Sequence, residues 1–323
     1  MPMPIYLSDA DVRSLLSPDE CAEIIEKLCR DDAKGMAEQT PTTELHLPKG
    51  PFRVKVGGAY GFNAYGLKAY LGNAGYRVLV YDLDDGFAGL VEAFAMTELR
   101  TGAVSAIAAK YLARADAGTL GIIGTGREAR SQIEAISRVR KLSLVKAYSR
   151  GEENRMAYAK EMSEKLGLDV QPVASAEECV RGSDIVVTIT SANEPVLKGE
   201  WLSEGAFVCG VGATGVYRRE LDEDAIARAE VVVVESLPVA ESECGDLIYA
   251  VARGRLRWNQ VVELKDIASG RVPARSGQGA ITLFDSIGTG AQDVAIAAEA
   301  IRKARAAGVG VVLPLPPPTT RRR

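Results

Sequence analysis

The sequence predicts an α/β fold with two parts: a Rossmann-type parallel sheet and an N-terminal α/β part. Three observations carry this prediction. A glycine-rich turn follows an apolar run within residues 119–129. From there to residue 284 short apolar runs alternate with helical patterns, which builds a parallel sheet covered on both faces. Before it, residues 42–94 carry β-type runs separated by turn residues, which is typical of an antiparallel sheet.

Composition places the chain among globular proteins. Its 323 residues suffice for two domains with their own cores, and 47% hydrophobic with 25% charged residues is ordinary. The net charge of −4 predicts no nucleic-acid partner, since the one basic run, 321–323, ends a proline-rich tail. No run approaches the roughly 20 apolar residues of a membrane helix, and no signal pattern opens the chain. We expect no membrane association and a cytoplasmic location.

Cysteine and histidine usage excludes further classes of site. The five cysteines are odd in number and far apart, without a C-x-x-C pair, so neither a disulfide framework nor a zinc cluster is indicated. His46 is the only histidine, and no His-rich metal site can be assembled from it. No metal is predicted.

The N-terminal third predicts helices followed by strands. Ser8 and Pro18 are helix-start signals, so residues 8–35 form two helices or one kinked helix. Thr97 is then expected to cap a helix that runs to Leu112. The β-type runs between these helices are 53–56, 65–70, 77–81 and 89–93, with Gly57-Gly58, Gly72-Asn73 and Asp84-Asp85-Gly86 as the separating turns.

The rest of the chain alternates strands and helices. After the glycine-rich turn we expect a helix to about residue 138, strands at 143–148, near 170, and at 185–189, 206–211, 231–235 and 281–284, and helices at 152–166, 176–180, 247–252, 262–267 and from about 293 to 307. The resulting domains are 116–284 for the Rossmann part and 1–115, with 285–323 returning, for the other.

The glycine-rich turn predicts a dinucleotide site. Gly124 allows the tight turn, Gly126 lets the backbone approach a pyrophosphate, and Ala129 keeps helix and strand close. The following helix offers its free N–H groups to phosphate. The expected contacts in this turn are Gly124, Thr125, Gly126, Arg127, Glu128 and Ala129.

The end of the second Rossmann strand decides between the two nicotinamide cofactors. An acid there binds the ribose 2′-OH, whereas an arginine accommodates a 2′-phosphate. This chain has Ser149-Arg150 and no acid at that point, which favours NADP(H). Glu152 and Glu153 follow closely, and either could fold back onto the ribose, so NAD(H) stays open.

Taken together, these motifs resemble the ornithine cyclodeaminase/mu-crystallin family, from the first helix to about Ala307. The resemblance implies a homodimer joined through its N-terminal part, with nicotinamide held against a small amino or imino acid. The matching stretches are Tyr65-Gly-Leu-Lys68, Leu99-Arg-Thr-Gly-Ala103, Ala108-Ala-Lys-Tyr-Leu112, Gly124-Thr-Gly126, Arg219-Glu-Leu-Asp222 and Ile281-Thr-Leu-Phe-Asp-Ser-Ile-Gly288.

Two basic residues match the active-site positions of that family. Lys68 corresponds to its catalytic lysine, and an ammonium beside an imine can hold a carboxylate or deliver a proton. Arg100 corresponds to the arginine that clamps the substrate carboxylate, a task for a planar bidentate donor. The alternatives are a surface lysine on a strand and a solvated charge on a helix.

Other positions depart from the family or match it less closely. Thr214 stands where the cyclodeaminases carry an aspartate, and a hydroxyl is a poor general base, so lyase chemistry is disfavoured. Lys55, flanked by Arg53, replaces the family's amine-recognising glutamate and favours a substrate with a second carboxylate, unless both side chains point to solvent. His46 is either a proton donor near the substrate or structural. Thr190, Ser191 and Ser286 match positions that approach the nicotinamide ribose.

Three functions compete. The first is an oxidoreductase that reduces an imino acid, or a 2-oxo acid with ammonia, to an L-amino acid. The second is a cyclodeaminase-type lyase, which the change at Thr214 opposes. The third is a cofactor-binding protein without turnover, resembling the crystallin member, which the presence of both Lys68 and Arg100 opposes.

Overall fold

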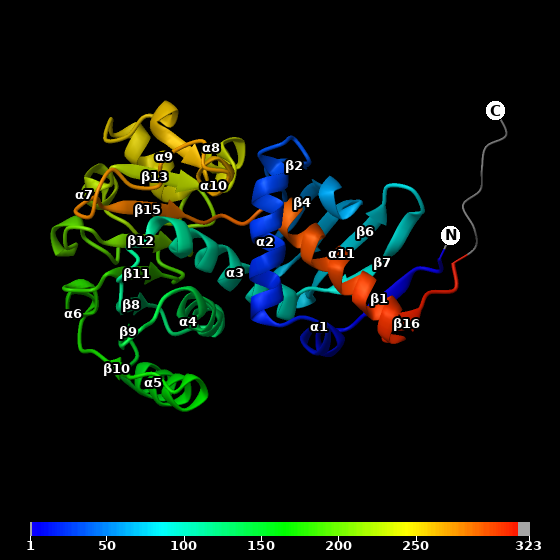
Figure 1. The fold of residues 1–323 in the computed structure, drawn as a ribbon, viewed down its shortest axis with the longest axis horizontal. Helices are drawn as coiled ribbons and strands as arrows, with labels where there is room; N and C mark the ends of the chain where they lie inside the picture. Colours follow the sequence, from blue (N-terminus) through cyan, green and yellow to red (C-terminus); the bar gives the residue numbers. More distant parts are fainter. Residues whose placement is uncertain (1, 316–323) are drawn as a thin grey trace.

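The computed structural model describes residues 2–315 and contains two β-sheets on opposite sides of the helix α3 (Phe94–Leu112) (Figure 1). We call the elements before α3, together with α11 (Gly290–Ala307) and β16 (Val311–Val312), the N-terminal lobe, and the elements β8 to β15 the Rossmann lobe. The predicted proline- and arginine-rich tail at 316–323 lies outside the described residues.

The Rossmann lobe is built on one parallel sheet of eight strands. Its order is β10-β9-β8-β11-β12-β15-β13-β14, and every pairing is parallel, which confirms the predicted fold class. The chain runs outward from β8 to β10 and then returns to β11 on the other side of β8, so the topological switch point lies between β8 and β11. The strands are β8 (Thr119–Ile123), β9 (Leu144–Tyr148), β10 (Val170–Pro172), β11 (Ile185–Thr188), β12 (Phe207–Gly210), β13 (Val231–Val234), β14 (Val261–Glu263) and β15 (Thr282–Asp285).

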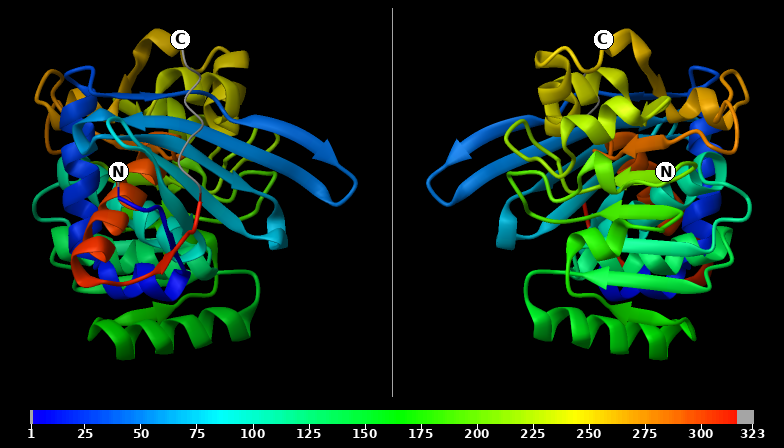
Figure 2. Two further views of the ribbon diagram at one scale, coloured as in Figure 1. Left: turned by 90° about the vertical axis from the view of Figure 1, so that its right-hand side faces the viewer. Right: turned by 90° about the vertical axis from the view of Figure 1, so that its left-hand side faces the viewer.

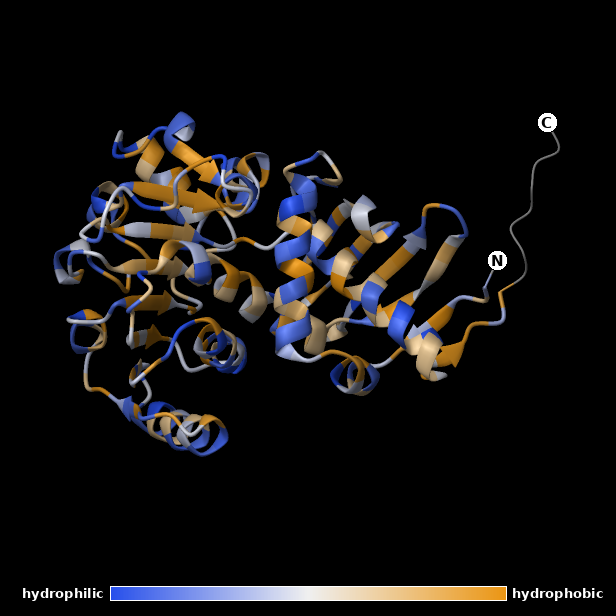
Figure 3. Cartoon of the chain, in the orientation of Figure 1, coloured by the Kyte–Doolittle hydropathy of each residue, from blue (hydrophilic) through white to orange (hydrophobic). Residues whose placement is uncertain are grey.

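Helices cover both faces of this sheet, and the strands between them are apolar (Figure 3). One predicted helix needs correction, because residues 261–263 extend the sheet as β14 and only Leu264–Ala268 is helical. The β-branched pair Val261-Val262 packs beside β13, and this outweighs its helical spacing. The other helices are α4 (Arg127–Val139), α5 (Glu152–Leu166), α6 (Ala176–Val180), α7 (Glu223–Arg228), α8 (Leu237–Glu243), α9 (Gly245–Ala252) and α10 (Leu264–Ala268).

The N-terminal lobe holds a second eight-stranded sheet, antiparallel except where β1 pairs with β7. Its order is β16-β1-β7-β6-β5-β4-β2, with β3 also on β4. The pattern did not predict β1, β2, β3 or β16, since two to five residues are too few to show a periodicity. The strands are β1 (Ile5–Leu7), β2 (Ala37–Gln39), β3 (Thr43–Leu47), β4 (Gly50–Ala59), β5 (Ala64–Tyr70), β6 (Tyr76–Asp82) and β7 (Gly86–Glu92).

Two local predictions in this lobe were wrong. Gly57 and Gly58 form no turn but lie inside β4, where α11 crosses the strand. A Cβ on Gly57 would lie 2.1 Å from the backbone nitrogen of Ala291, so the glycine serves close packing. Thr97 does not cap α3, because the helix begins three residues earlier at Phe94 and the Thr97 hydroxyl donates to the carbonyl of Ala93 (2.5 Å).

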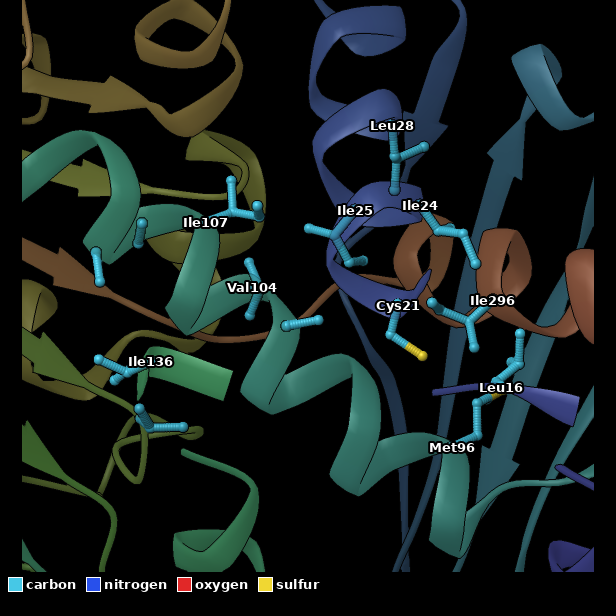
Figure 4. Close-up of a cluster of buried hydrophobic side chains, with 14 of the residues drawn as sticks. Leu16, Cys21, Ile24, Ile25, Leu28, Met96, Val104, Ile107, Ile136 and Ile296 are labelled. Atoms are coloured by element: carbon cyan, nitrogen blue, oxygen red, sulfur yellow. The ribbon is translucent and has the colours of Figure 1, made fainter. Parts of the chain in front are cut away.

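Two separate helices follow β1, which is one of the two predicted alternatives for residues 8–35. Both α1 (Asp9–Leu15) and α2 (Pro18–Asp32) begin with a capping box, at Ser8 and Ser17. In Figure 4 the buried side chains of α2 point toward α11 on one side and α3 on the other. The labelled members of this core are Leu16, Cys21, Ile24, Ile25, Leu28, Met96, Val104, Ile107, Ile136 and Ile296. This packing joins the two lobes.

A hairpin of β3 and β4 extends away from the body of the N-terminal lobe (Figure 2). It exposes Leu45 and Leu47. Within residues 2–315 no helix is both long and apolar enough to cross a membrane, and no three His, Cys, Asp or Glu side chains are grouped to hold a metal ion. All five cysteines are free thiols.

Candidate active site

Three charged side chains from three elements meet between the lobes. Lys68 comes from β5, Arg100 from α3 and Asp293 from α11. The Lys68 Nζ lies 3.2 Å and the Arg100 Nε lies 3.3 Å from the same Asp293 Oδ1. All three are buried, with 2%, 7% and 0% of their surface exposed. Because one carboxylate serves two cations, the cluster carries a net positive charge that suits an anionic ligand.

The surroundings of Lys68 prepare it for proton transfer. Burial lowers the pKa of Lys68 to about 8, although the Asp293 carboxylate acts in the opposite direction. Its Nζ also donates to the Thr97 hydroxyl (2.9 Å), and the rings of Tyr70 and Tyr76 lie 5.4 and 5.6 Å away. A lysine with such a pKa can exchange a proton near neutral pH. The alternative of a solvated strand lysine is wrong for Lys68.

Lys55 lies beside this cluster, but its ammonium is occupied. It stands opposite Lys68 in the β4–β5 register and is only 5% exposed. Its Nζ donates to the carbonyls of Ile287 (2.9 Å) and Gly288 (2.7 Å) and lies 3.7 Å from the Glu243 carboxylate. The solvent-pointing alternative is therefore wrong for Lys55. Arg53 is partly exposed, and its Nε lies 2.5 Å from Glu44.

The structure does not bring His46 to the cluster. Its side chain is 87% exposed on the β3–β4 hairpin, 3.3 Å from Glu44. It lies opposite Pro51 on β4, whereas Lys68 lies opposite Lys55, a separation of about 13 Å along the strand. The catalytic prediction for His46 thus receives no support from the described chain, because the hairpin carries the residue outward.

Thr214 is exposed on the loop after β12, where its backbone forms a bridge with Cys244. Its side chain is exposed to water, and a hydroxyl in water is a poor general base near neutral pH. A substrate contact by Thr214 stays a prediction.

The glycine-rich turn has the geometry that a dinucleotide needs. Gly124 has a φ of +113°, and a Cβ there would lie 2.3 Å from the carbonyl oxygen of Ile189. Gly126 is the N-cap of α4, and a Cβ there would meet nothing within 4 Å. Ala129 is buried, and its carbonyl accepts a hydrogen bond from Tyr158 (2.8 Å). Gly126 therefore leaves its side of the turn open at the N-terminus of α4, where a pyrophosphate is expected.

The other predicted residues of the turn lie around this space. The Thr125 hydroxyl donates to that of Ser149 (2.9 Å), which joins the loops after β8 and β9. Arg127 lies over the ring of Phe94 and 3.2 Å from Glu98, with Glu128 beside it (3.5 Å). The turn therefore connects directly to the start of α3.

Arg150 is exposed after β9, at the place expected for a ribose phosphate. Arg155 on α5 was not predicted to lie here, and its Nη1 donates to the carbonyl of Ser149 (3.2 Å). Its position one turn into the helix that follows Arg150 was the available signal. Two arginines thus flank this loop.

A buried carboxylate holds the loops that were expected to approach the nicotinamide. Glu220 accepts from the backbone N–H of Thr190 (2.5 Å) and of Gly212 (2.7 Å), which ties the ends of β11 and β12 together. Ser191 follows Thr190 and is exposed. Ser286 is 2% exposed and donates its hydroxyl to Glu235 (2.8 Å), so a direct cofactor contact by this hydroxyl stays a prediction.

The remaining members of the Arg219-Glu-Leu-Asp222 motif are structural. Arg219 lies 3.4 Å from Asp246 and over the ring of Tyr249, and Asp222 caps α7. The motif matched the family in sequence, but no role was predicted for Glu220. Asp293 was not predicted as a site residue. It lies in the first turn of α11, and the available signal was an acid among residues that are otherwise uncharged and buried.

Comparisons with known proteins agree with this geometry. The chain is 32% identical to the alanine dehydrogenase of Archaeoglobus fulgidus, over 95% of this chain and 97% of that protein. It is 40% identical to a Delta(1)-pyrroline-2-carboxylate reductase of Bacillus cereus, over 68% of each. The Thermococcus litoralis Delta(1)-pyrroline-2-carboxylate reductase, solved with NADH and L-proline, superimposes with a TM-score of 0.91 at 32% identity and covers 96% of this chain and 100% of that one.

An archaeal alanine dehydrogenase dimer with bound NAD superimposes with a TM-score of 0.89, at 32% identity and over 96% and 98% of the two chains. These relatives are oxidoreductases, and NAD or NADH is bound in the two solved structures. The sequence model of the ornithine cyclodeaminase/mu-crystallin family matches residues 4–307. The chain belongs to the ornithine cyclodeaminase/mu-crystallin family, as the sequence motifs predicted.

Proposed function

We propose that this protein reduces a small imino acid with one carboxylate to an L-amino acid, with NADP(H) as the favoured cofactor. The observation that carries the proposal is the buried cluster in which Lys68 and Arg100 share Asp293. A cyclic imine such as a pyrroline-2-carboxylate fits this charge, and so does the imine formed from a 2-oxo acid and ammonia. Two relatives carry the corresponding names.

The side chains of the buried cluster would have separate roles in the reduction. Arg100 would hold the carboxylate, since its guanidinium forms paired hydrogen bonds with such a group. Lys68 would give the proton on Nζ to the imine nitrogen while the imine carbon accepts a hydride, which leaves an amine and a neutral lysine. Bound nicotinamide supplies that hydride. The turn at Gly124 and Gly126 and the strand ends held by Glu220 would position it.

The charge of the neighbouring side chains argues against a second substrate carboxylate. Lys55 has Glu243 and two carbonyls as partners, and Arg53 has Glu44. The expectation of an acidic substrate relied on both cations being available. Since both are compensated, the site offers one uncompensated positive charge, and we propose a monocarboxylate.

The test is a screen of cyclic imino acids, and of 2-oxo acids with ammonia or methylamine, that follows NADPH absorbance. We expect the highest kcat/KM with a monocarboxylate imine. Turnover confined to dicarboxylates would contradict the charge argument, and no turnover with any imine would contradict the proposed function.

The cofactor preference gives a separate prediction. We expect NADPH to bind more tightly than NADH, and Arg150→Ala to remove much of the difference. Losing one charge-assisted contact costs about 1.5–3 kcal/mol, or roughly tenfold to a hundredfold in Kd. Fluorescence titration of both cofactors measures this, with Arg181→Ala on the same lobe as the control. Equal affinities in the parent protein would contradict the preference.

The lyase alternative is tested with ornithine. We expect no conversion to proline, because Thr214 is an exposed hydroxyl where the cyclodeaminases carry an aspartate. Proline and ammonia are measured after incubation with catalytic NAD. Their accumulation would show that another residue supplies the base.

We further propose that the protein is a homodimer joined through the N-terminal lobe. The sheet of this lobe exposes apolar side chains on β3, β4 and β5, and exposed apolar patches are typical of subunit contacts. Those described are Leu45, Leu47, Val56 and Tyr65. Light scattering after size-exclusion chromatography would measure the mass.

A further inference from the structure

The segment 286–289 crosses from β15 of the Rossmann lobe to α11 of the N-terminal lobe. Glu235, directly after β13, binds the amide side of this linker. Its carboxylate accepts from the hydroxyl of Ser286 (2.8 Å) and from the N–H groups of Ile287 (3.0 Å) and Gly288 (2.9 Å). Glu235 is 7% exposed, so these bonds are shielded from water. The linker is thereby tied to the Rossmann lobe.

Lys55 of the N-terminal lobe binds the carbonyl side of the same linker. Its Nζ donates to the oxygens of Ile287 and Gly288, at 2.9 and 2.7 Å. Two linker residues, Ile287 and Gly288, thus lie between a buried carboxylate and a buried ammonium. Their N–H groups bind the carboxylate of Glu235, and their carbonyl groups bind the ammonium of Lys55. Any rotation between the lobes at this crossing would break bonds to one of the two side chains.

A second carboxylate of the Rossmann lobe, that of Glu243, contacts the N-terminal lobe at Thr42 and Lys55. Glu243 ends α8, the helix that begins two residues after Glu235. It accepts from both the N–H and the hydroxyl of Thr42, each at 2.6 Å, and lies 3.7 Å from the Lys55 Nζ. Thr42 precedes β3, so Glu243 reaches across to the N-terminal lobe. Glu243 thus pairs with Lys55 directly, whereas Glu235 holds the linker that Lys55 also binds.

The linker also touches the proposed active site. Gly288 has a φ of +64°, and a Cβ on it would lie 2.3 Å from Nη1 of Arg100. Lys55 in turn stands opposite Lys68 on the neighbouring strand. A shift of the linker would therefore move the guanidinium that holds the substrate, and a shift of β4 would move the strand that carries the lysine.

We propose that Glu235, Glu243 and Lys55, called the α8 bracket, are positioning residues that set the angle between the lobes. The bracket holds Lys68, on β5 of the N-terminal lobe, and Arg100, on α3 between the lobes, at a constant distance from the nicotinamide pocket of the Rossmann lobe. Its catalytic consequence rests on the proposed function, whereas its effect on the linker does not. Hydride transfer is sensitive to shifts of about 1 Å, so a loosened bracket lowers turnover more than binding.

Hydrogen exchange on the full-length protein without ligand tests the effect on the linker. In Lys55→Met and Glu243→Gln we expect the amides of 286–289 to exchange at least tenfold faster than in the parent. Lys55→Met removes the ammonium that binds the carbonyls of Ile287 and Gly288, and Glu243→Gln removes the negative charge that pairs with this ammonium. Glu241→Gln, the same chemical change on the exposed side of α8, should leave this exchange unchanged. Unchanged exchange in Glu243→Gln, the milder variant, would overturn the bracket even if Lys55→Met failed to fold.

Kinetics test the positioning role. We expect kcat to fall about tenfold in Glu243→Gln, with the Kd of NADPH within twofold of the parent and a larger primary isotope effect from 4-deuterated NADPH. Lys55→Arg, which keeps a cation at this position, should retain much of the turnover that Lys55→Met loses. Faster exchange with unaltered kcat and isotope effect would overturn the positioning role. If the parent reduced no imine at all, the proposed function would fail, and the exchange result alone would decide whether the bracket exists.

Discussion

Lys68→Ala is expected to lower kcat for imine reduction by about 10²–10⁴-fold, the range of a positioned acid–base group. The reason is that charge develops at the imine nitrogen only as hydride arrives, so the proton from Nζ stabilises the transition state more than the ground state. The Kd of NADPH should stay nearly unchanged, since Lys68 lies on β5 and the nucleotide turn lies in the other lobe. Steady-state kinetics and cofactor titration measure the two quantities.

Arg100→Ala is the comparison for this result. Its carboxylate contact would exist in both the ground state and the transition state, so KM should rise while kcat falls less. The two variants should therefore separate in kinetics. Near-normal turnover of Lys68→Ala on the best substrate would return Lys68 to a structural role in the buried cluster.

Asp293→Asn is expected to destabilise the fold by about 3–5 kcal/mol, because it removes the one carboxylate between two buried cations. It should also move the pH dependence. Asp293 raises the pKa of Lys68, so without it that pKa falls below about 8. Reduction needs protonated Lys68, and its rate is lost as pH rises through this pKa. The alkaline limb of the kcat profile should therefore shift to lower pH.

Urea unfolding and a pH–rate profile check these two effects. Glu299→Gln, on α11 but paired with Arg302 near the surface, is the matched control and should change neither quantity by much. An Asp293→Asn protein with parent stability and an unmoved alkaline limb would show that the carboxylate does not control Lys68.

The features predicted correctly from the sequence depend on neighbours along the chain. The dinucleotide turn was identified because Gly124, Gly126 and Ala129 act within one strand, one turn and one helix. The alternating strands of the Rossmann lobe were readable because a strand buried on both sides is a continuous apolar run, such as 231–234. Lys68 and Arg100 were found through contiguous motifs of the family.

Packing decided what these local signals left open. Asp293 lies 225 residues from Lys68 in sequence, so no local pattern shows that they meet. Lys55 looked like a second substrate cation until the linker carbonyls and Glu243 were seen to occupy it. Gly57 and Gly58 looked like a turn because the helix that crosses β4 comes more than 230 residues later. A sequence window records residue types, whereas the partner of a buried charge or a close backbone contact is chosen only when distant elements pack together.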